Sequence, residues 1–352
     1  MAHPFVVGGR RALALALLCL VGACGGGGGS SSPDPNGNAG GTDQQPANNT
    51  LSGHLLYSTS VPTDQTYLGS ADASSIEIAV TSDPDPVAWP DASQYLEYTL
   101  GGAGTDQINV FNSANRQLLY QVQVPSFCGR LRASPVSKTQ VLGQCFQSLL
   151  SNQGILVVID LAGSSLVHSE PDQPKRYKYR WLPDGTVLRV HDETGAIAKA
   201  TVGGAWQTLG QLSVPSNRRV QALEVNVQGT RLAMTFREYS DFANETPSTV
   251  ADLWVANLNG SAQERVTSNG NVYAVQWSPD GSKLAFNVDT SSCGDASACG
   301  GTSSWWVAAS SARNLQSLVA GVAHASAAQL QRRFPSGNVT PLVGTDLMAW
   351  LP

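Results

Sequence analysis

Cysteine and histidine are the residues of this chain whose types and spacing could support chemistry. The sequence has six cysteines, which are Cys19, Cys24, Cys128, Cys145, Cys293 and Cys299. No two of them have the C-x-x-C spacing of zinc sites and redox dithiols, and no histidine lies near the last four in sequence. His168 and Glu170 have the H-x-E spacing of zinc deaminases, but no P-C-x-x-C accompanies them. The G-x-S-x-G, H-E-x-x-H and P-loop motifs are also absent from the sequence, so it shows no local catalytic motif.

The first 23 residues have the regions of an export signal. Arg10 and Arg11 end a short positive segment, and the next twelve residues are apolar or small and uncharged. This stretch is too short to cross a bilayer, which needs about 20 apolar residues. The segment VGAC that ends at Cys24 resembles the lipobox of bacterial lipoproteins, in which small residues precede a cysteine that carries the lipid. The resemblance implies that residues 1–23 are cleaved and Cys24 is lipidated; ordinary secretion is the alternative.

The chain after the signal is sparsely charged and acidic. Without Arg10 and Arg11, the 21 basic residues become 19, against 26 acidic ones, so the net charge is −7. Together with the absence of a Lys/Arg run, this argues against nucleic acid as a partner and leaves the lipid as the only expected membrane attachment. Residues 24–52 are rich in Gly, Ser, Asn and Pro and have little to bury, which is typical of a disordered tether. The folded domain is therefore predicted over residues 53–352.

A repeated pattern within residues 53–352 predicts the fold. Short apolar runs alternate with Gly, Asn, Asp, Ser and Pro, which is typical of an all-β protein. The clearest unit is VYAVQWSPDGSKLAFNV (272–288), in which two strands flank a tight turn. Aligning the residue before that turn places the repeats at Trp89, Ala133, Trp181, Val225 and Trp277. Their spacings of 44, 48, 44 and 52 residues suit the four-stranded blades of a β-propeller.

The unit WSPDGSKLAF, with DLWVANLNGSAQERVTS upstream of it, resembles the repeats of TolB-type six-bladed propellers. The resemblance implies a ring of four-stranded blades in which the WSPDG turn joins the two inner strands. It concerns the fold and leaves the activity open. The C-terminal LMAWLP matches the first strand of a blade, and the strands that would complete this blade stand at the start of the domain. We therefore predict a six-bladed β-propeller whose last blade is closed by strands from both termini.

The four cysteines that follow Cys24 predict two disulfides, because their number is even and the chain is exported. In the repeat at Ala133 the turn is centred near residue 136.5, so residues whose numbers add up to 273 should oppose each other. Cys128 and Cys145 satisfy this condition and are predicted to be bonded. Cys293 and Cys299 would then close the loop DTSSCGDASACGGTSS.

Three insertions are expected on one face of the ring, opposite the tether. FREYSDFANETPSTVADL and VDTSSCGDASACGGTSSWW each fall between the second and third strands of a blade, and AGVAHASAAQLQRRFPSGNVTPLVGTD (320–346) falls in the next crossover. Long loops on a rigid scaffold often carry recognition, and solvated loops without a role are the alternative. The candidate contacts with a partner are Tyr239, Phe242, Trp305, Arg332, Arg333 and Phe334.

The expected function is that of a non-enzymatic module of the cell envelope, without a cofactor, that binds a protein or another envelope ligand. Gly25 rather than Asp follows the lipidated cysteine, and this resembles lipoproteins of the outer membrane that face the periplasm. The alternative is an enzyme similar to propeller lactonases, with a metal in the central channel. Its ligands would come singly from different blades and would leave no local motif. A structural lipoprotein without a specific ligand is a third interpretation.

The substitution Cys24→Ser is expected to release the protein from the membrane fraction, because the lipid on Cys24 is the only attachment that the sequence predicts. Fractionation with a high-salt wash, followed by immunoblotting, measures this. Cys19→Ser, which changes a cysteine inside the signal segment, is the control and should leave the protein with the membranes. A Cys24→Ser protein that still sediments would contradict the lipoprotein interpretation.

Overall fold

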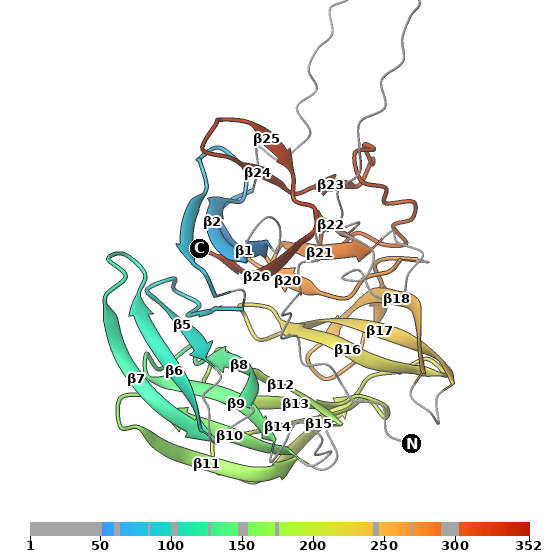
Figure 1. The fold of residues 1–352 in the computed structure, drawn as a ribbon. Coiled ribbons are helices and arrows are strands. Elements are labelled where there is room, and N and C mark those ends of the chain that lie inside the picture. The colour runs from blue at the N-terminus through green and yellow to red at the C-terminus, as the bar shows by residue number, and fades with distance from the viewer. Residues whose placement is uncertain are drawn as a thin grey trace, which may run out of the picture. The chain divides into compact units, whose positions relative to one another are not determined.

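β-Strands make up all the regular secondary structure that the computed structural model describes, as the sequence pattern predicts (Figure 1). The model describes residues 51–59, 64–83, 85–99, 105–125, 128–146, 154–172, 176–241, 246–268, 270–289 and 303–352. Among these residues there is no helix with the length and hydrophobicity needed to cross a bilayer. The predicted lipidation site Cys24, the pair Cys293 and Cys299, and Phe242 all lie outside the described residues.

Six four-stranded antiparallel sheets, here called blades 1 to 6, are present in the described part of the chain (Figure 1). Blade 1 contains β4 (Val87–Ala88), β5 (Gln94–Thr99), β6 (Thr105–Asn112) and β7 (Leu118–Pro125). Blade 2 contains β8 (Cys128–Ala133), β9 (Gln140–Phe146), β10 (Gly154–Asp160) and β11 (Ser165–Asp172). Blade 3 contains β12 (Tyr177–Trp181), β13 (Val187–His191), β14 (Ala196–Ala200) and β15 (Gln207–Gln211).

The remaining blades follow the same order, apart from the last. Blade 4 contains β16 (Arg218–Val225), β17 (Arg231–Asp241), β18 (Thr246–Asn257) and β19 (Glu264–Arg265). Blade 5 contains β20 (Val275–Trp277), β21 (Lys283–Asp289), β22 (Ser303–Ala309) and β23 (Ala327–Gln329). Blade 6 contains β26 (Thr345–Leu351), β1 (His54–Thr59), β2 (Gln65–Ser70) and β3 (Ile78–Thr81). A hairpin of β24 (Gln331–Arg333) and β25 (Val339–Pro341) lies between blades 5 and 6 in sequence.

The first strand of each blade ends where the repeat alignment places it. Ala133, Trp181, Val225 and Trp277 are the last residues of β8, β12, β16 and β20, and Trp89 directly follows β4. In the turn after Trp277, Gly281 has a φ of 72°, which a residue without Cβ adopts at low cost. Asp280 Oδ1 accepts the N–H of Ser282 at 3.0 Å, a hydrogen bond typical of such turns. The Pro-Asp-Gly sequences therefore mark the turns between the inner two strands.

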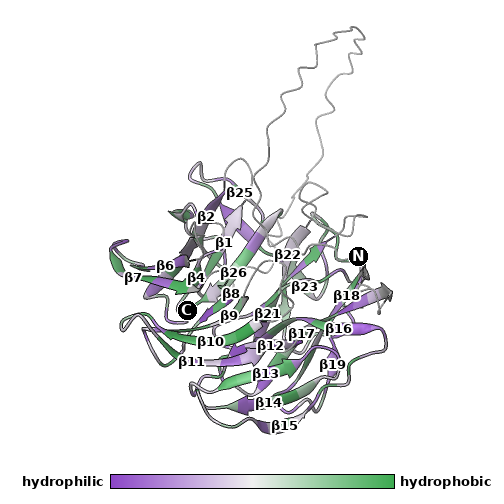
Figure 2. Cartoon of the chain, turned by 60° about the horizontal axis from the view of Figure 1, so that its bottom comes forward, coloured by the Kyte–Doolittle hydropathy of each residue, from purple (hydrophilic) through white to green (hydrophobic). Residues whose placement is uncertain are grey.

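The tryptophans at these turns hold neighbouring blades together. Trp181 Nε1 donates to the carbonyl of Arg132 in blade 2 at 3.0 Å, and its ring packs with Leu142 and Leu156 of the same blade. Trp277 Nε1 donates to the carbonyl of Glu224 in blade 4 at 3.4 Å. The apolar stretches run along the strands (Figure 2), and the core consists of clusters of buried side chains, several of which join adjacent blades.

Strands from the two ends of the domain close the ring, as predicted. β26 pairs with β1 from His54 opposite Leu351 to Thr59 opposite Thr345. As the first strand of blade 6, β26 also packs against β20 of blade 5 and β4 of blade 1. Trp350 Nε1 donates to the carbonyl of Ser52 at 2.9 Å. Because β1 also pairs with β2, β26 becomes the innermost strand of a complete four-stranded blade.

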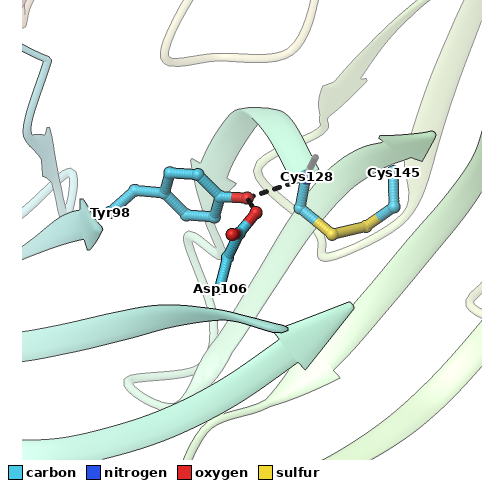
Figure 3. Close-up of a disulfide and its surroundings, with 4 residues drawn as sticks. All are labelled: Tyr98, Asp106, Cys128 and Cys145. Carbon is cyan, nitrogen blue, oxygen red and sulfur yellow. Dashed lines mark hydrogen bonds between the residues drawn. A yellow bond between two sulfur atoms is a disulfide. The ribbon is translucent and has the colours of Figure 1, made fainter. Parts of the chain in front are cut away.

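Cys128 and Cys145 lie directly opposite each other on β8 and β9 and are joined by a disulfide (Figure 3). The pairing agrees with the sequence prediction, but it arises differently. Close to the turn, the numbers of two opposing residues add up to 274, as for Ala133 opposite Val141. A bulge between Gly129 and Arg132 then shifts the register by one residue, so the numbers of the two opposing cysteines add up to 273. The predicted turn centre was therefore half a residue too low, and the bulge, which was not predicted, compensates for this error at the cysteines.

Deleting residues 347–352 is expected to destabilise the whole ring, because β26 supplies the first strand of blade 6 and buries Trp350. Removal of that indole alone by Trp350→Ala should cost about 3–5 kcal/mol. Thermal denaturation measures both changes, with deletion of the exposed Pro352 as the control. A deletion variant that melts at the temperature of the intact protein would refute closure by the two ends.

An unreduced digest of the protein is expected to contain a peptide in which Cys128 is linked to Cys145. The loop between them spans 17 positions, for which a disulfide contributes about 3 kcal/mol to the free energy of unfolding. Mass spectrometry identifies the linkage, and denaturation with and without reductant measures its contribution. Linkage of Cys128 to Cys293 or Cys299 would contradict the register.

Candidate binding site in the central channel

Trp305 is a core residue and the prediction that it contacts a partner is wrong. It lies on β22, the third strand of blade 5, with 1% of its surface exposed. Its Nε1 donates to the carbonyl of Thr345 in blade 6 at 2.9 Å, and its ring packs with Leu347 and Trp350. Trp306, the next residue, packs on the other side of the same blade with Leu253 and Val255 of blade 4. Alternation along a central strand directs both indoles into the contacts between blades.

Arg332 and Phe334 are also engaged within the protein. Arg332 of β24 donates from Nε and Nη2 to the two carboxylate oxygens of Glu77, at 2.8 and 2.6 Å. Its guanidinium lies 4.3 Å from the ring centroid of Phe334 and 5.0 Å from that of Tyr67. Tyr57 donates to Glu77 as well, and burial raises the pKa of this tyrosine. These contacts fasten the hairpin of β24 and β25 to blade 6.

The six predicted contact residues do not form one surface in the described part of the chain. Arg333 donates from Nε to the carbonyl of Ala73 at 2.8 Å, again on blade 6. Tyr239 belongs to blade 4, where the guanidinium of Arg219 lies 4.9 Å from its ring centroid. The insertion predicted over residues 320–346 is not one continuous crossover loop. Its residues 327–329 form β23, the fourth strand of blade 5. Residues 320–326 therefore belong to the connection between the third and fourth strands, on the face opposite the crossover.

A cavity of about 290 Å³ lies between the first strands of blades 2 to 6. Apart from Gln144 of β9, its charged and amide side chains come from strands β8, β12, β16 and β20, which the ring holds face to face. These side chains are Arg130, Arg132, Gln144, Lys178, Arg180, Gln221, Glu224 and Gln276. This cavity was not among the predicted sites.

The repeat alignment contains the signal that locates this cavity. Arg132, Arg180, Glu224 and Gln276 each stand one position before the residue that ends the first strand of their blade. Equivalent positions in a ring of similar blades face the same axis, so these four side chains converge although 44 to 52 residues separate them. The sequence prediction aligned only the residue that precedes each turn, so the charged and amide residues one position earlier were missed as a site.

Bulges adjust the side chains that line the cavity. Arg130 has a φ of 54° within the bulge of β8, and its Nη1 donates to Oε1 of Gln144 at 3.0 Å. In β16 the register shifts between Val220 and Leu223. Gln221 and Glu224 consequently both reach the cavity although three positions separate them. A bulge can redirect a side chain in this way without ending the strand.

The cavity has an excess of positive charge. Among the described residues that line it, Arg130, Arg132, Lys178 and Arg180 are basic, and Glu224 is the only carboxylate. Arg180 Nη2 donates to Glu224 Oε1 at 2.9 Å, and Arg132 Nη2 lies 3.7 Å from the same oxygen. The charge of Arg180, followed by desolvation, lowers the pKa of Arg132 to about 10 against the opposing effect of Glu224. Arg132 therefore stays protonated at neutral pH while it is crowded by like charge.

Two polar atoms in the described lining are buried and lack a hydrogen-bond partner: Nε of Arg180, a donor, and Oε1 of Gln221, an acceptor. Buried polar groups in proteins are nearly always paired. Both atoms are buried, so a molecule in the cavity does not reach them in this structure.

These residues do not suit the metal that the lactonase-like alternative requires. A divalent cation prefers carboxylate oxygens or imidazoles, and here it would meet three guanidinium groups, an ammonium group and one carboxylate that is already paired. Within the described ranges, no three His, Cys, Asp or Glu residues are grouped so that they could hold a metal ion. The His168 imidazole lies 3.5 Å from Glu170, whose carboxylate accepts the indole N–H of Trp206, and none of these three residues lines the cavity.

No family model and no curated protein matches the chain. Solved structures with a similar fold include a protein from Agrobacterium tumefaciens assigned as a TolB, with 14% identity over 86% of this chain and 99% of that one and a TM-score of 0.49. An oligogalacturonate lyase in complex with manganese shares 14% identity over 72% and 70% of the two chains, with a TM-score of 0.47. The β-propeller domain of the Trilobed protease from Pyrococcus furiosus shares 10% over 69% and 72%, with a TM-score of 0.44. At these identities the likeness concerns the fold alone.

Proposed function

We propose that this protein is a lipid-anchored binding module of the cell envelope whose ligand enters the central channel of the propeller. The observation that carries the proposal is the positively charged cavity between the first strands of blades 2 to 6. Ligand pockets are typically concave, largely preformed and supplied with a few convergent polar groups. The cavity has these properties, since its charged and amide side chains come from strands rather than from loops.

The composition of the cavity favours binding over catalysis. Its described lining has a single carboxylate and neither Ser, Cys nor His, so it offers no pair of acids and no nucleophile beside a base. Glu224, the one carboxylate in the described lining, accepts a hydrogen bond from Arg180. The lining also includes Lys178, Tyr179 and Tyr273, and its excess of cationic side chains over carboxylates supports the binding interpretation.

The envelope location rests on the N-terminal sequence and on the cysteines. The signal segment and the cysteine at position 24 favour lipidation after export. The disulfide between Cys128 and Cys145 suits an oxidising compartment such as the periplasm. A small anionic ligand or an envelope protein that inserts an anionic group would both have access to the channel there.

Photo-methionine offers a direct test of the channel as the binding site. Of the three methionines, Met1 falls in the predicted signal peptide, Met234 is fully buried, and Met348 lines the cavity. Irradiation of cells that have incorporated this analogue is expected to attach the ligand at Met348. Mass spectrometry of the purified full-length protein identifies the adduct.

Two variants make this test specific. Met348→Leu should abolish the adduct, because it removes the photoreactive group without a change of charge, and Arg132→Gln should reduce it at least tenfold. Arg313→Gln is the matched control, since Arg313 pairs with Glu264 away from the cavity. The absence of any adduct at Met348, or an adduct that Arg132→Gln leaves unchanged, would refute binding in the channel.

A further inference from the structure

We propose that the propeller contacts the lipid surface of the membrane through an apolar rim at the outer edge of blades 6, 1 and 2. This inference goes beyond ligand binding in the channel and rests on the proposed lipid anchor at Cys24. The rim consists of six apolar side chains near the starts of the fourth strands of these blades, each with 37% to 60% of its surface exposed. They are Ile76, Ile78, Leu118, Leu119, Leu166 and Val167.

The rim lies on the face of the ring that carries the inner turns. The strands of a blade alternate in direction, so the fourth strand starts on the face where the first strand ends. In all three blades a backbone N–H of the outer turn donates to a carbonyl of the inner turn, at 2.7 to 3.1 Å. The donor and acceptor residues are Ala71 and Gly53 in blade 6, Ser113 and Ser93 in blade 1, and Leu161 and Thr139 in blade 2.

The three segments of the rim belong to consecutive blades, because β26 packs against β4 and β4 packs against β8 (Figure 1). Their turns also contact one another. Arg116, in the turn before β7, donates to the carbonyl of Ala79 in β3. Lys138 of blade 2 donates from Nζ to Oγ of Ser93 in blade 1 at 2.7 Å. The six apolar side chains therefore belong to one sector of one face.

Equivalent bulges expose two consecutive apolar side chains in blade 1 and in blade 2. In β7 the register shifts after Leu118, so Leu119 is an extra residue. In β11 it shifts at the same place, after Leu166, so Val167 is an extra residue. A bulge interrupts the alternation that would otherwise direct one of the two side chains inward. Both blades therefore present a pair of apolar groups at the same end of their outermost strand.

The corresponding positions of blades 3 and 4 are polar. The exposed residues at the starts of their fourth strands are Gln207 and Thr208 in β15 and Glu264 in β19. Val319 and Val322 of blade 5 are also exposed. They follow Leu315, whose bridge to Thr267 places this connection along the outer edge of blade 4. The outer edge of the ring therefore has an apolar sector and a polar sector on the same face.

The point where the chain enters the domain favours the membrane as the occupant of the rim. The described chain begins at Leu51, and the carbonyl of Gly53 accepts the N–H of Ala71 in the turn that leads to Ile76. The predicted tether thus joins the domain beside the rim. Residues 25–50 separate Cys24 from this point, and a flexible chain of that length has an end-to-end distance of about 30 Å. The lipid would hold this face of the ring close to the bilayer.

The chemistry of the rim suits the interfacial region of a bilayer. Residues 118–124 and 164–169, which contain its members in blades 1 and 2, have no Lys, Arg, Asp or Glu. Apolar side chains at the interface bind in proportion to the apolar area that they bury. Six partly exposed side chains would not hold the protein alone, which agrees with the expected release of the Cys24→Ser protein. The tether makes the contact intramolecular and so raises its effective concentration.

Fluorescence quenching by lipids that carry a nitroxide tests the inference with the lipidated full-length protein in phosphatidylcholine vesicles. A fluorophore is attached through Ser113→Cys, in the turn before β7, or through Ser216→Cys, in the crossover on the opposite face; both serines are exposed. The unsubstituted protein gives the background from native cysteines. Quenching should be stronger at position 113 than at position 216 by a factor of about three or more. A smaller ratio, or the reverse order, would overturn the proposal.

Variants of the rim separate its contact from the effect of the tether. Leu119→Ser combined with Leu166→Ser should bring the quenching ratio close to one, because the lipid anchor remains and the apolar contact is lost. Val319→Ser combined with Val322→Ser is the matched control, since these side chains are equally exposed and lie outside the rim. Thermal denaturation should show that both pairs leave the fold intact. An unchanged ratio in the rim variant would overturn the proposal.

Two further measurements distinguish the ways in which the inference can fail. Sedimentation in detergent reveals a dimer; a dimer that the rim variant abolishes, together with equal quenching at the two positions, would assign the rim to a second copy of the chain. Mass spectrometry of the N-terminal peptide reports the lipid on Cys24. Without this lipid, the proposed anchor is wrong and the inference falls with it. With the lipid present and equal quenching, the inference alone is wrong.

Discussion

The pairing of β26 with β1 is the constraint on which the rest of this structure depends. Each blade could satisfy its internal hydrogen bonds alone, but its apolar faces require a neighbour on both sides. The contact between Trp350 and Ser52, 298 positions apart, joins the last strand to the start of the domain and gives every blade two neighbours. Closure also sets the width of the channel, since six first strands must then surround one axis.

The channel shows how this constraint produces a site that no single segment contains. Arg132 and Arg180 repel each other, as the lowered pKa of Arg132 indicates. Their approach is therefore imposed by the strands that carry them. Glu224 from blade 4 offsets part of the repulsion, and the bulges in β8 and β16 turn further polar groups inward. The same framework therefore assembles a cluster of like charges that no single segment of the chain contains.

The large side chains beside the long connections have a different role from the one the sequence suggested. Trp305 packs between blades 5 and 6, and Arg332 joins the hairpin of β24 and β25 to Glu77. Aromatic and arginine side chains are common in binding surfaces, but they are equally suited to the contacts between blades. A side chain in a binding surface differs from one in a contact between blades by how much of its surface is exposed. The sequence does not give this exposure.

The sequence by itself determined the strand pattern, the five inner turns, the six-bladed count and the strands that close the ring. These properties depend on local turn chemistry and on a repeat of 44 to 52 residues, both of which are visible in the order of residues. It also indicated that Cys128 faces Cys145, although the bulge at Arg130 that makes the register work has no visible signal. The tertiary structure alone decided that Trp305 is buried and that Arg132, Arg180 and Glu224 meet in one cavity. The physical reason is that convergence depends on the radius of the closed ring and on the direction of each side chain, and both are set by packing between blades that are distant in sequence.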